Sequence, residues 1–247
     1  SLVKGIRSAN PSAEIMASRR NLSALAPEIS GLANLTSDNE ELIKKSEIII
    51  LALKPYTILT FLKEHSSYFD PAKHTIISVA TGINSDEISS VLPAGIGVYR
   101  AMPNTASSVN ESVTMVSVGL DPLQRRDTVT AIFNSVGEVI LIEEALMESA
   151  TILGACGIAY VLRFMRAMIQ GGIEVGFDAT TASRIVAQTM KGAAELVIQN
   201  QSHPEMEIDK VTTPKGCTIV GLNEMEHAGF SSALIKGIVS SYKKIER

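Results

Sequence analysis

The sequence predicts a doubly wound α/β domain over residues 1–144, followed by an all-helical domain over residues 145–247. Two observations support this prediction. Short apolar runs rich in Val and Ile alternate with amphipathic segments over residues 14–142, and from about residue 145 onward only helical periodicity remains. A chain of 247 residues is also long enough for two domains, each with its own core.

Six apolar runs predict the strands of the first domain. Most of them are nearly continuous in apolarity, as strands covered on both faces require, and we therefore expect a parallel sheet. One helical stretch between them opens with the capping-box pattern Ser37-Asp38-Asn39-Glu40. Such alternation of strands and helices specifies the doubly wound arrangement. The predicted strands are EIMAS (14–18), EIIILAL (47–53), TIISVA (75–80), GVYRA (97–101), VTMVSV (113–118) and EVILI (138–142).

Two apolar stripes at helical spacing predict long helices in the second domain. Between residues 145 and 176 we expect a further long helix, interrupted near Gly154 and Gly157, because each glycine weakens a helix by about 1 kcal/mol relative to Ala. The interruption fits either a site of close approach or simple packing between helices. A fairly apolar helical half also suggests burial against a second chain. The stripes are Ala182, Ile185, Val186, Thr189, Ala193, Leu196 and Val197, and Leu234, Ile235, Ile238, Val239, Tyr242 and Ile245.

The composition excludes two classes of partner. The formal net charge of −4 lacks the basic field that a nucleic-acid surface needs. The apolar run at residues 48–53 is stopped by Lys54-Pro55, far short of a membrane span. We therefore expect neither nucleic acid nor a membrane among the partners.

The Cys and His residues show no metal-binding pattern. Cys156 and Cys217 lie far apart in the sequence, and the four His residues are scattered without the spacing of ligands. We therefore expect no metal site. Two thiols without a signal peptide are typical of a reducing compartment, so the predicted location is cytoplasmic.

The end of the first predicted strand suggests a dinucleotide. At the end of the second strand of a dinucleotide-binding domain, an acid binds the adenosine ribose, whereas an Arg accommodates a 2′-phosphate. Here Ser18, Arg19 and Arg20 follow the strand, and no acid does. Guanidinium groups and a hydroxyl offer donors to a phosphate, so the pattern favours NADPH, with NADH as the alternative coenzyme. An Arg pair in a loop is also typical of a solvated surface.

Three further strand ends carry small or polar residues that suit a flat ring and its amide. Ligands of doubly wound sheets bind at such ends. The alternative for the two proline-containing ends is a plain loop start, since Pro ends strand pairing. The candidate cofactor-binding residues are Ala52, Lys54 and Pro55, then Ala80 and Thr81, then Met102, Pro103 and Asn104.

The stretch DKVTTPKGCTIVGL at residues 209–222 predicts a loop that ends at a helix N-terminus. Pro214 and Gly216 mark a turn, and the apolar spacing that follows is helical. The unpaired N–H groups of such an end can bind an anion. The alternative is an ordinary N-cap, in which the Thr213 or Thr218 side chain accepts from one of these groups.

With LALKP, AMPNT and DKVTTPKGCTIVGLNEMEHAGF considered together, the chain resembles the pyrroline-5-carboxylate reductase family over nearly its whole length. Four motifs of the family (A-V-K-P, M-P-N-T, S-G-S-G-P-A-Y and T-S-P-G-G-T-T) correspond in order to residues 52–55, 102–105, 154–160 and 212–218. The resemblance implies a Rossmann-like domain followed by an all-α dimerisation domain. This domain interlocks with its twin in a homodimer, which in some members builds larger homo-oligomers.

The resemblance also implies the reaction and its site. A hydride passes from NAD(P)H to the imine carbon of 1-pyrroline-5-carboxylate, which gives L-proline in the last step of proline biosynthesis. By the family pattern, the substrate carboxylate is bound by the loop residues Thr213, Lys215, Gly216, Cys217 and Thr218, chiefly through backbone N–H groups. Thr218 offers its hydroxyl to the ring nitrogen and is the expected catalytic residue. A hydroxyl suits this role because it can both donate and accept a hydrogen bond.

The chain departs from the family pattern in three places. It lacks the first strand with its Gly-x-Gly-x-x-Gly turn, and we expect residues to precede Ser1. Lys215 and Cys217 replace a Gly and a Thr of the loop, while Cys156 and Ile158 replace a Ser and a Pro. A Lys that needs a positive φ is strained, although its ammonium can attract the carboxylate. Two alternatives therefore stay open: a catalytically silent nucleotide-binding or regulatory homologue, and a reductase of another small cyclic imine.

Overall fold

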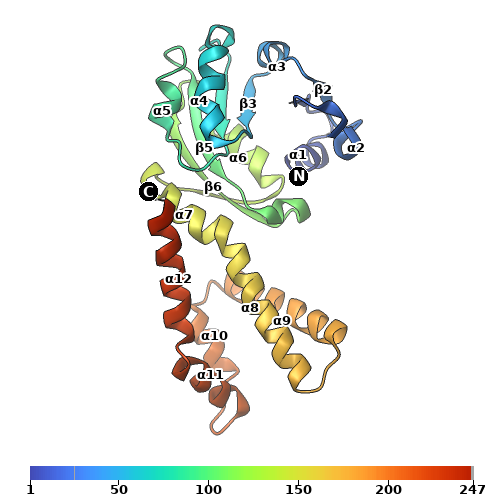
Figure 1. Cartoon of the computed structure of the whole chain (residues 1–247), viewed down its shortest axis with the longest axis vertical. Coiled ribbons are helices and arrows are strands. Elements are labelled where there is room, and N and C mark those ends of the chain that lie inside the picture. The colour runs from blue at the N-terminus through green and yellow to red at the C-terminus, as the bar shows by residue number, and fades with distance from the viewer. Residues whose placement is uncertain (25, 246–247) are drawn as a thin grey trace. The chain divides into compact units, whose positions relative to one another are not determined.

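The computed structural model describes residues 1–24 and 26–245, which form two compact units, Ser1–Cys156 and Gly157–Lys244 (Figure 1). The first unit carries strands and helices, and the second carries helices only. This pattern confirms the prediction of an α/β half followed by an all-helical half.

The strands of the first unit form two sheets. Five of them make one sheet in the order β3-β4-β5-β6-β7, and β1 pairs with β2 in a separate parallel pair. All six predicted strands are present, and β2 was not predicted because three residues, Asn-Leu-Thr, are too few to show a periodicity. The strands are β1 (Met16–Ser18), β2 (Asn34–Thr36), β3 (Ile48–Leu51), β4 (Thr75–Ser78), β5 (Gly97–Met102), β6 (Ser112–Leu120) and β7 (Gly137–Leu141).

The prediction of a parallel sheet is wrong for one pair of strands. β3, β4 and β5 run parallel to one another and β7 runs parallel to β6, but β6 runs antiparallel to β5. Only residues 103–111 connect β5 to β6. This connection is shorter than the crossover of about a dozen residues that a parallel neighbour needs, so the chain reverses direction.

One edge of β1 and one edge of β3 have no partner strand among the residues that the structure describes. β1 and β3 are therefore edge strands among these residues.

The helices of the first unit are short. Its α-helices are α1 (Leu2–Ala9), α2 (Ala26–Ile29), α3 (Asn39–Lys45), α4 (Pro55–Glu64), α5 (Ser85–Ser89), α6 (Arg126–Asn134) and α7 (Met147–Ala150). Single helical turns of other types are η1 (Leu22–Ala24), η2 (Ser66–Tyr68), η3 (Thr105–Val109), η4 (Glu144–Leu146) and the π-helical η5 (Thr151–Cys156).

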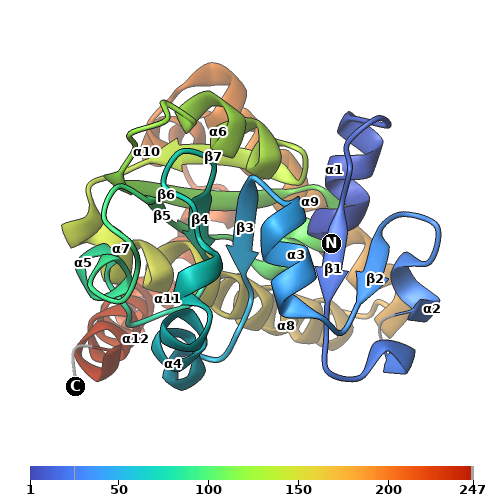
Figure 2. The same ribbon diagram turned by 90° about the horizontal axis from the view of Figure 1, so that it is seen from above.

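Helices cover both faces of the five-stranded sheet, because successive residues of a strand point to opposite faces. Ile76 of β4 and Val98 of β5 pack with residues of α3, α4 and α5, whereas the next residues, Ile77 and Tyr99, pack with α1 and α6 (Figure 2). Every residue of β4 and β5 is buried. These two strands are therefore the centre of the core and fix the positions of the loops that follow them.

The start of α3 illustrates how local sequence sets a helix boundary. The N-cap is Asp38, whose carboxylate accepts from the backbone N–H of Glu41 at 3.1 Å. The predicted capping box with Ser37 as N-cap is therefore wrong by one residue, because the longer acceptor arm of Asp38 reaches the free N–H group. Pairs of Glu and Lys four residues apart along α3 add support to the exposed face.

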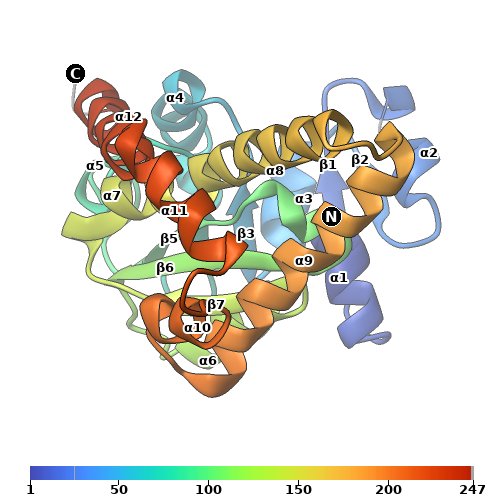
Figure 3. The ribbon, with the colours of Figure 1, turned by 90° about the horizontal axis from the view of Figure 1, so that it is seen from below.

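The second unit consists of the helices α8 (Gly157–Glu174), α9 (Ala179–Asn200), α10 (Pro204–Lys210), α11 (Cys217–His227) and α12 (Phe230–Ile245) (Figure 3). α8 packs closely on α9, where a Cβ at Gly172 would lie 3.2 Å from that of Ala182. The Tyr160 hydroxyl donates to the Ser241 hydroxyl at 2.7 Å and so ties α8 to α12.

The interruption expected near Gly154 and Gly157 is the π-helical turn η5, after which α8 begins. Helical structure is therefore continuous over Glu144–Glu174. This run is long and apolar enough to cross a membrane, and only 17% of its most apolar stretch is buried within the single chain. An interface with a second chain requires the same kind of exposed apolar surface.

Candidate functional site

Eight of the eleven predicted cofactor-binding residues lie at one edge of the five-stranded sheet, because the parallel strands β3, β4 and β5 all end there. Ala80 and Met102 are buried and belong to the core, whereas the segment after β3 is exposed. The residues at this edge are Ala52, Lys54 and Pro55 after β3, Ala80 and Thr81 after β4, and Met102, Pro103 and Asn104 at the end of β5.

A shallow depression of about 470 Å³ lies beside the end of β5. Hydroxyl groups of the 3₁₀ turn η3 and of Ser1, the N-cap of α1, form much of its wall. The Ser107 and Ser1 hydroxyls hydrogen-bond at 3.0 Å, so this turn and the start of α1 are held together. The lining residues are Ser1, Pro103, Asn104, Thr105, Ser107, Ser108 and Ala155.

Ser18, Arg19 and Arg20 lie at the end of β1 in the separate strand pair. The Ser18 hydroxyl donates to Oδ1 of Asn39 at the start of α3. Arg19 and Arg20 are exposed. Since the Ser18 proton is already donated, the two guanidinium groups are the charged donors that a phosphate at this strand end would meet.

The loop before α11 lies in the second unit and presents free backbone N–H groups. Its N-cap is Gly216, and no side chain caps the helix, so the interpretation of Thr213 or Thr218 as an ordinary N-cap is wrong. The Thr213 carbonyl instead accepts from the N–H of Gly216 at 2.9 Å, which closes a tight turn. A Cβ at Gly216 would lie 2.5 Å from the Thr213 hydroxyl, so a larger residue here would require Thr213 to shift. The N–H groups of the first turn of α11 are therefore available to an anion.

Lys215 has a φ of 61°, in the left-handed region that strains a residue with a Cβ, so the positive φ predicted for this position is present. Lys215 and Cys217 are exposed, and Thr218 is half-buried in the first turn of α11. All five predicted substrate-binding residues thus lie in one short segment, residues 213–218, which comprises the loop turn and the start of α11. Cys156 and Cys217 are both free thiols.

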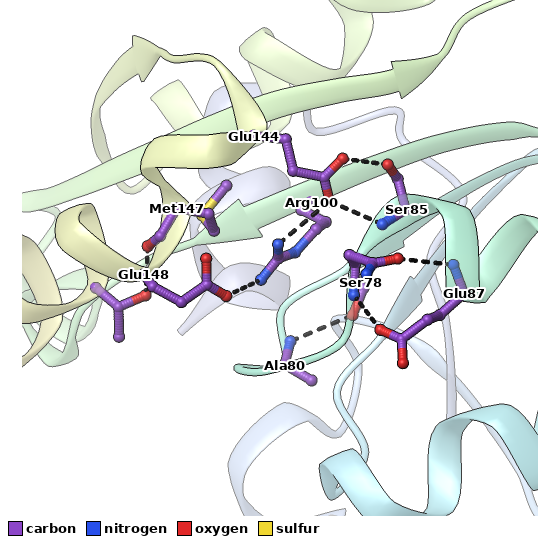
Figure 4. A network of polar contacts seen from close by, with 10 residues as sticks. Ser78, Ala80, Ser85, Glu87, Arg100, Glu144, Met147 and Glu148 are labelled. Atoms are coloured by element: carbon purple, nitrogen blue, oxygen red, sulfur yellow. Dashed lines mark hydrogen bonds and ion pairs between the residues drawn. The ribbon is translucent and has the colours of Figure 1, made fainter. Parts of the chain in front are cut away.

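An ion-pair network at the start of the helical run Glu144–Glu174 was not predicted. Arg100 of β5 donates to Glu144 at 3.2 Å and to Glu148 at 3.0 Å, and its side chain is only 3% exposed (Figure 4). Glu144 also accepts from the backbone N–H of Ser85 at 2.7 Å and from the Ser85 hydroxyl. The network joins β5, α5 and the helical run that begins at Glu144. Its sequence signal was Arg100 itself, a charge inside an apolar strand.

The hydrogen bonds to Glu144 control its ionisation. Burial would raise the pKa of this carboxyl group, but the bonds from Ser85 and Arg100 outweigh burial and lower the pKa below its ordinary value. The carboxylate is therefore ionised at neutral pH and compensates the buried guanidinium.

The donors at the sheet edge fit a dinucleotide phosphate. The hydroxyls of the depression offer hydrogen-bond donors. The first turn of α1 contains no acidic residue that would repel a phosphate. At the end of β1, the exposed Arg19 and Arg20 add positive charge. Within residues 1–24 and 26–245 the His, Cys, Asp and Glu side chains form no group of three that could hold a metal ion.

Two family descriptions match the chain. Residues 144–247 match "Pyrroline-5-carboxylate reductase dimerisation", and residues 1–82 match "NADP oxidoreductase coenzyme F420-dependent". The chain is similar to pyrroline-5-carboxylate reductases 1 and 2 of Dictyostelium discoideum. It is 42% identical to the first over 94% of this chain and 44% of the relative, and 43% identical to the second over 85% of this chain and 75% of the relative. The chain thus spans less than half of the first relative and three quarters of the second.

Solved structures show the same fold. A pyrroline-5-carboxylate reductase from Coxiella burnetii has a TM-score of 0.92 at 24% identity, over 99% of this chain and 92% of that chain. The Plasmodium falciparum pyrroline carboxylate reductase, solved with NADP bound, has a TM-score of 0.85 at 26% identity, over 99% of this chain and 91% of that chain.

Proposed function

Because the chain belongs to the pyrroline-5-carboxylate reductase family, we propose that it reduces 1-pyrroline-5-carboxylate to L-proline with NAD(P)H. The observation that carries this proposal is the turn at residues 213–218, which ends in uncapped N–H groups at the start of α11. A small ring with one carboxylate is the kind of ligand that such a turn binds.

The coenzyme would be held along the carboxyl edge of the sheet. Arg19 and Arg20 would bind a 2′-phosphate, so NADPH is the proposed coenzyme and NADH the alternative. Thr81, Pro103 and the hydroxyl-lined depression would adjoin the rest of the dinucleotide. When bound, the reduced nicotinamide supplies a hydride for the imine carbon.

The residues of the turn before α11 would bind and orient the substrate. The N–H groups of Cys217 and Thr218 would donate to the substrate carboxylate, and no buried opposing charge is needed. Lys215, exposed and fixed in the left-handed conformation, would add positive charge near this anion. The imine nitrogen must gain a proton as the carbon is reduced, and the Thr218 hydroxyl can donate a hydrogen bond to this nitrogen. The contribution of the chain is then mainly orientation and hydrogen bonding.

The proposed assembly is a homodimer or a larger homo-oligomer. Its support is the match of residues 144–247 to a dimerisation family, together with the exposed apolar residues of the helical unit. A second chain would cover the apolar surface of the run Glu144–Glu174. The proposed location is the cytoplasm, and a small molecule, rather than nucleic acid or a membrane, is the proposed ligand.

The test is an assay of NADPH oxidation with 1-pyrroline-5-carboxylate, for the 247-residue chain and for a version extended at its N-terminus. We expect imine-dependent oxidation, faster with NADPH than with NADH, and proline as the product. Cofactor binding without turnover by the extended version would instead identify a silent homologue. Faster turnover of a six-membered cyclic imine would point to another substrate, which the substitutions at Lys215 and Cys217 would explain.

A further inference from the structure

Both ends of the Asn104 side-chain amide are engaged within the protein. Its Oδ1 accepts from the backbone N–H of Ala106 at 3.0 Å, and its Nδ2 donates to the carbonyl oxygen of Gly154 at 3.1 Å. Asn104 is 9% exposed, and its own N–H donates to the Ser112 hydroxyl at 3.0 Å. The side chain is therefore held in one orientation by bonds within the protein at both ends of its amide.

The hydrogen bond to Gly154 reaches the π-helical turn η5, Thr151–Cys156. Such turns are rare, and they occur frequently at functional sites. They also change the direction of a helix. The contacts between this π turn and the sheet therefore affect the direction in which α8 begins.

A second contact holds the same residue. A Cβ at Gly154 would lie 2.4 Å from Cε of Met115 and 2.9 Å from its Sδ, so glycine allows the turn to approach β6 this closely. Met115 is itself buried with Met102 and Met147. One hydrogen bond from the end of β5 and one close contact with β6 thus fix the π turn against the sheet.

We propose that Asn104 is a positioning residue, which holds the π turn in place beside the cofactor edge of the sheet. This inference rests on the proposed function. Ala155 of the turn lines the same depression as Asn104 and Thr105, so a shift of the turn reshapes this depression. The residues directly after the turn, 157–160, belong to the motif that resembles the opening of the family's helical domain. Misplacement by about 1 Å in such a setting can slow a reaction about a hundredfold.

The substitution Asn104→Asp tests the donor while keeping the size of the side chain. An ionised carboxylate still accepts from Ala106, but it faces the Gly154 carbonyl with an oxygen instead of an N–H. We expect kcat to fall at least about tenfold at about pH 8. A buried carboxyl group beside a carbonyl oxygen has a raised pKa, and when protonated it again donates to that oxygen. The deficit relative to wild type should therefore shrink at about pH 5.5.

The matched control is Asn110→Asp, which adds the same charge at the exposed end of the same turn, η3. It should leave kcat and its pH profile unchanged. Gly154→Ala displaces the π turn from the other side and should lower kcat in the same way without the recovery at low pH. If Asn104→Asp does not fold at high pH, Gly154→Ala still tests whether the position of the π turn affects kcat.

Amide hydrogen exchange over residues 151–160 gives a readout that does not need turnover. Exchange should be faster in Asn104→Asp than in Asn110→Asp at about pH 8. An inactive wild type would overturn the proposed function, and the exchange comparison would then decide the role of Asn104 alone. An active wild type with the same kcat, pH profile and exchange in both Asp variants would overturn the positioning role.

Discussion

The network around Arg100 leads to a quantitative prediction for Glu144→Gln. Glu144 accepts three hydrogen bonds, two from Ser85 and one from Arg100, and its side chain is 27% exposed. The amide oxygen of Gln can keep the two bonds that Oε1 accepts, from the Ser85 N–H and from Arg100, whereas its NH2 group must donate to the Ser85 hydroxyl. Hydrogen bonds to charged groups contribute about 1 kcal/mol more than neutral ones, so three bonds set an upper limit of about 3 kcal/mol. Partial exposure of the carboxylate and the remaining pair between Arg100 and Glu148 reduce the expected loss to about 2 kcal/mol.

The pH dependence of this loss has a definite sign. The pKa of Glu144 in the folded protein lies below its ordinary value of 4.5, so the ionised carboxylate stabilises the fold. This stabilisation is complete above the ordinary value and is lost as the pH falls through the lowered pKa. The difference in unfolding free energy between wild type and Glu144→Gln should therefore be constant near neutrality and decrease at acidic pH.

Urea unfolding followed by circular dichroism, at neutral pH and at several acidic values, measures this difference. The control is Glu143→Gln, because Glu143 is a neighbouring exposed residue with the same charge. Its substitution should change the free energy of unfolding by less than about 0.5 kcal/mol. Equal losses for the two variants, or a loss for Glu144→Gln that does not decrease at acidic pH, would refute the reasoning.

Three predictions concern the proposed reaction. Arg19→Ala should raise the KM for NADPH about tenfold and leave the KM for NADH nearly unchanged, as measured by steady-state kinetics with both coenzymes. An equal rise in both KM values would contradict the binding of a 2′-phosphate by Arg19. Thr218→Ala should lower kcat about a hundredfold with little change in coenzyme affinity, whereas an unchanged kcat would limit the hydroxyl to a structural role. Lys215→Gly should raise the KM for the imine severalfold at low salt and less at high salt, because ions screen an exposed charge. A KM insensitive to salt in both proteins would contradict the role of the ammonium group.

Elements with a strong local pattern could be predicted from the sequence. The apolar runs identified six strands, because burial on both faces leaves a continuous apolar run, and the helical stripes identified the second unit, because burial on one face leaves a periodicity. The strand ends could also be named as candidate site segments, since parallel strands end at a common edge. The roles of those residues stay predictions.

Features that depend on three-dimensional geometry could not be predicted in this way. The reversal at β6 depends on the short connection after β5, and the first turn of α11 is uncapped because its N-cap is Gly216, which has no side chain. The two glycines at 154 and 157 indicated an interruption of the helix, but not a π turn held by Asn104. The partners of Arg100 lie more than forty positions away, and no local pattern reports such a pairing.

The exposure of Arg19 and Arg20 has a consequence for coenzyme affinity. Both side chains lie in solvent at the end of β1. An exposed Arg side chain loses rotamer freedom when a phosphate holds it, at a cost of about 1 kcal/mol for each side chain. The affinity for a 2′-phosphate would therefore be lower than the charge-assisted hydrogen bonds of the two guanidinium groups alone would give.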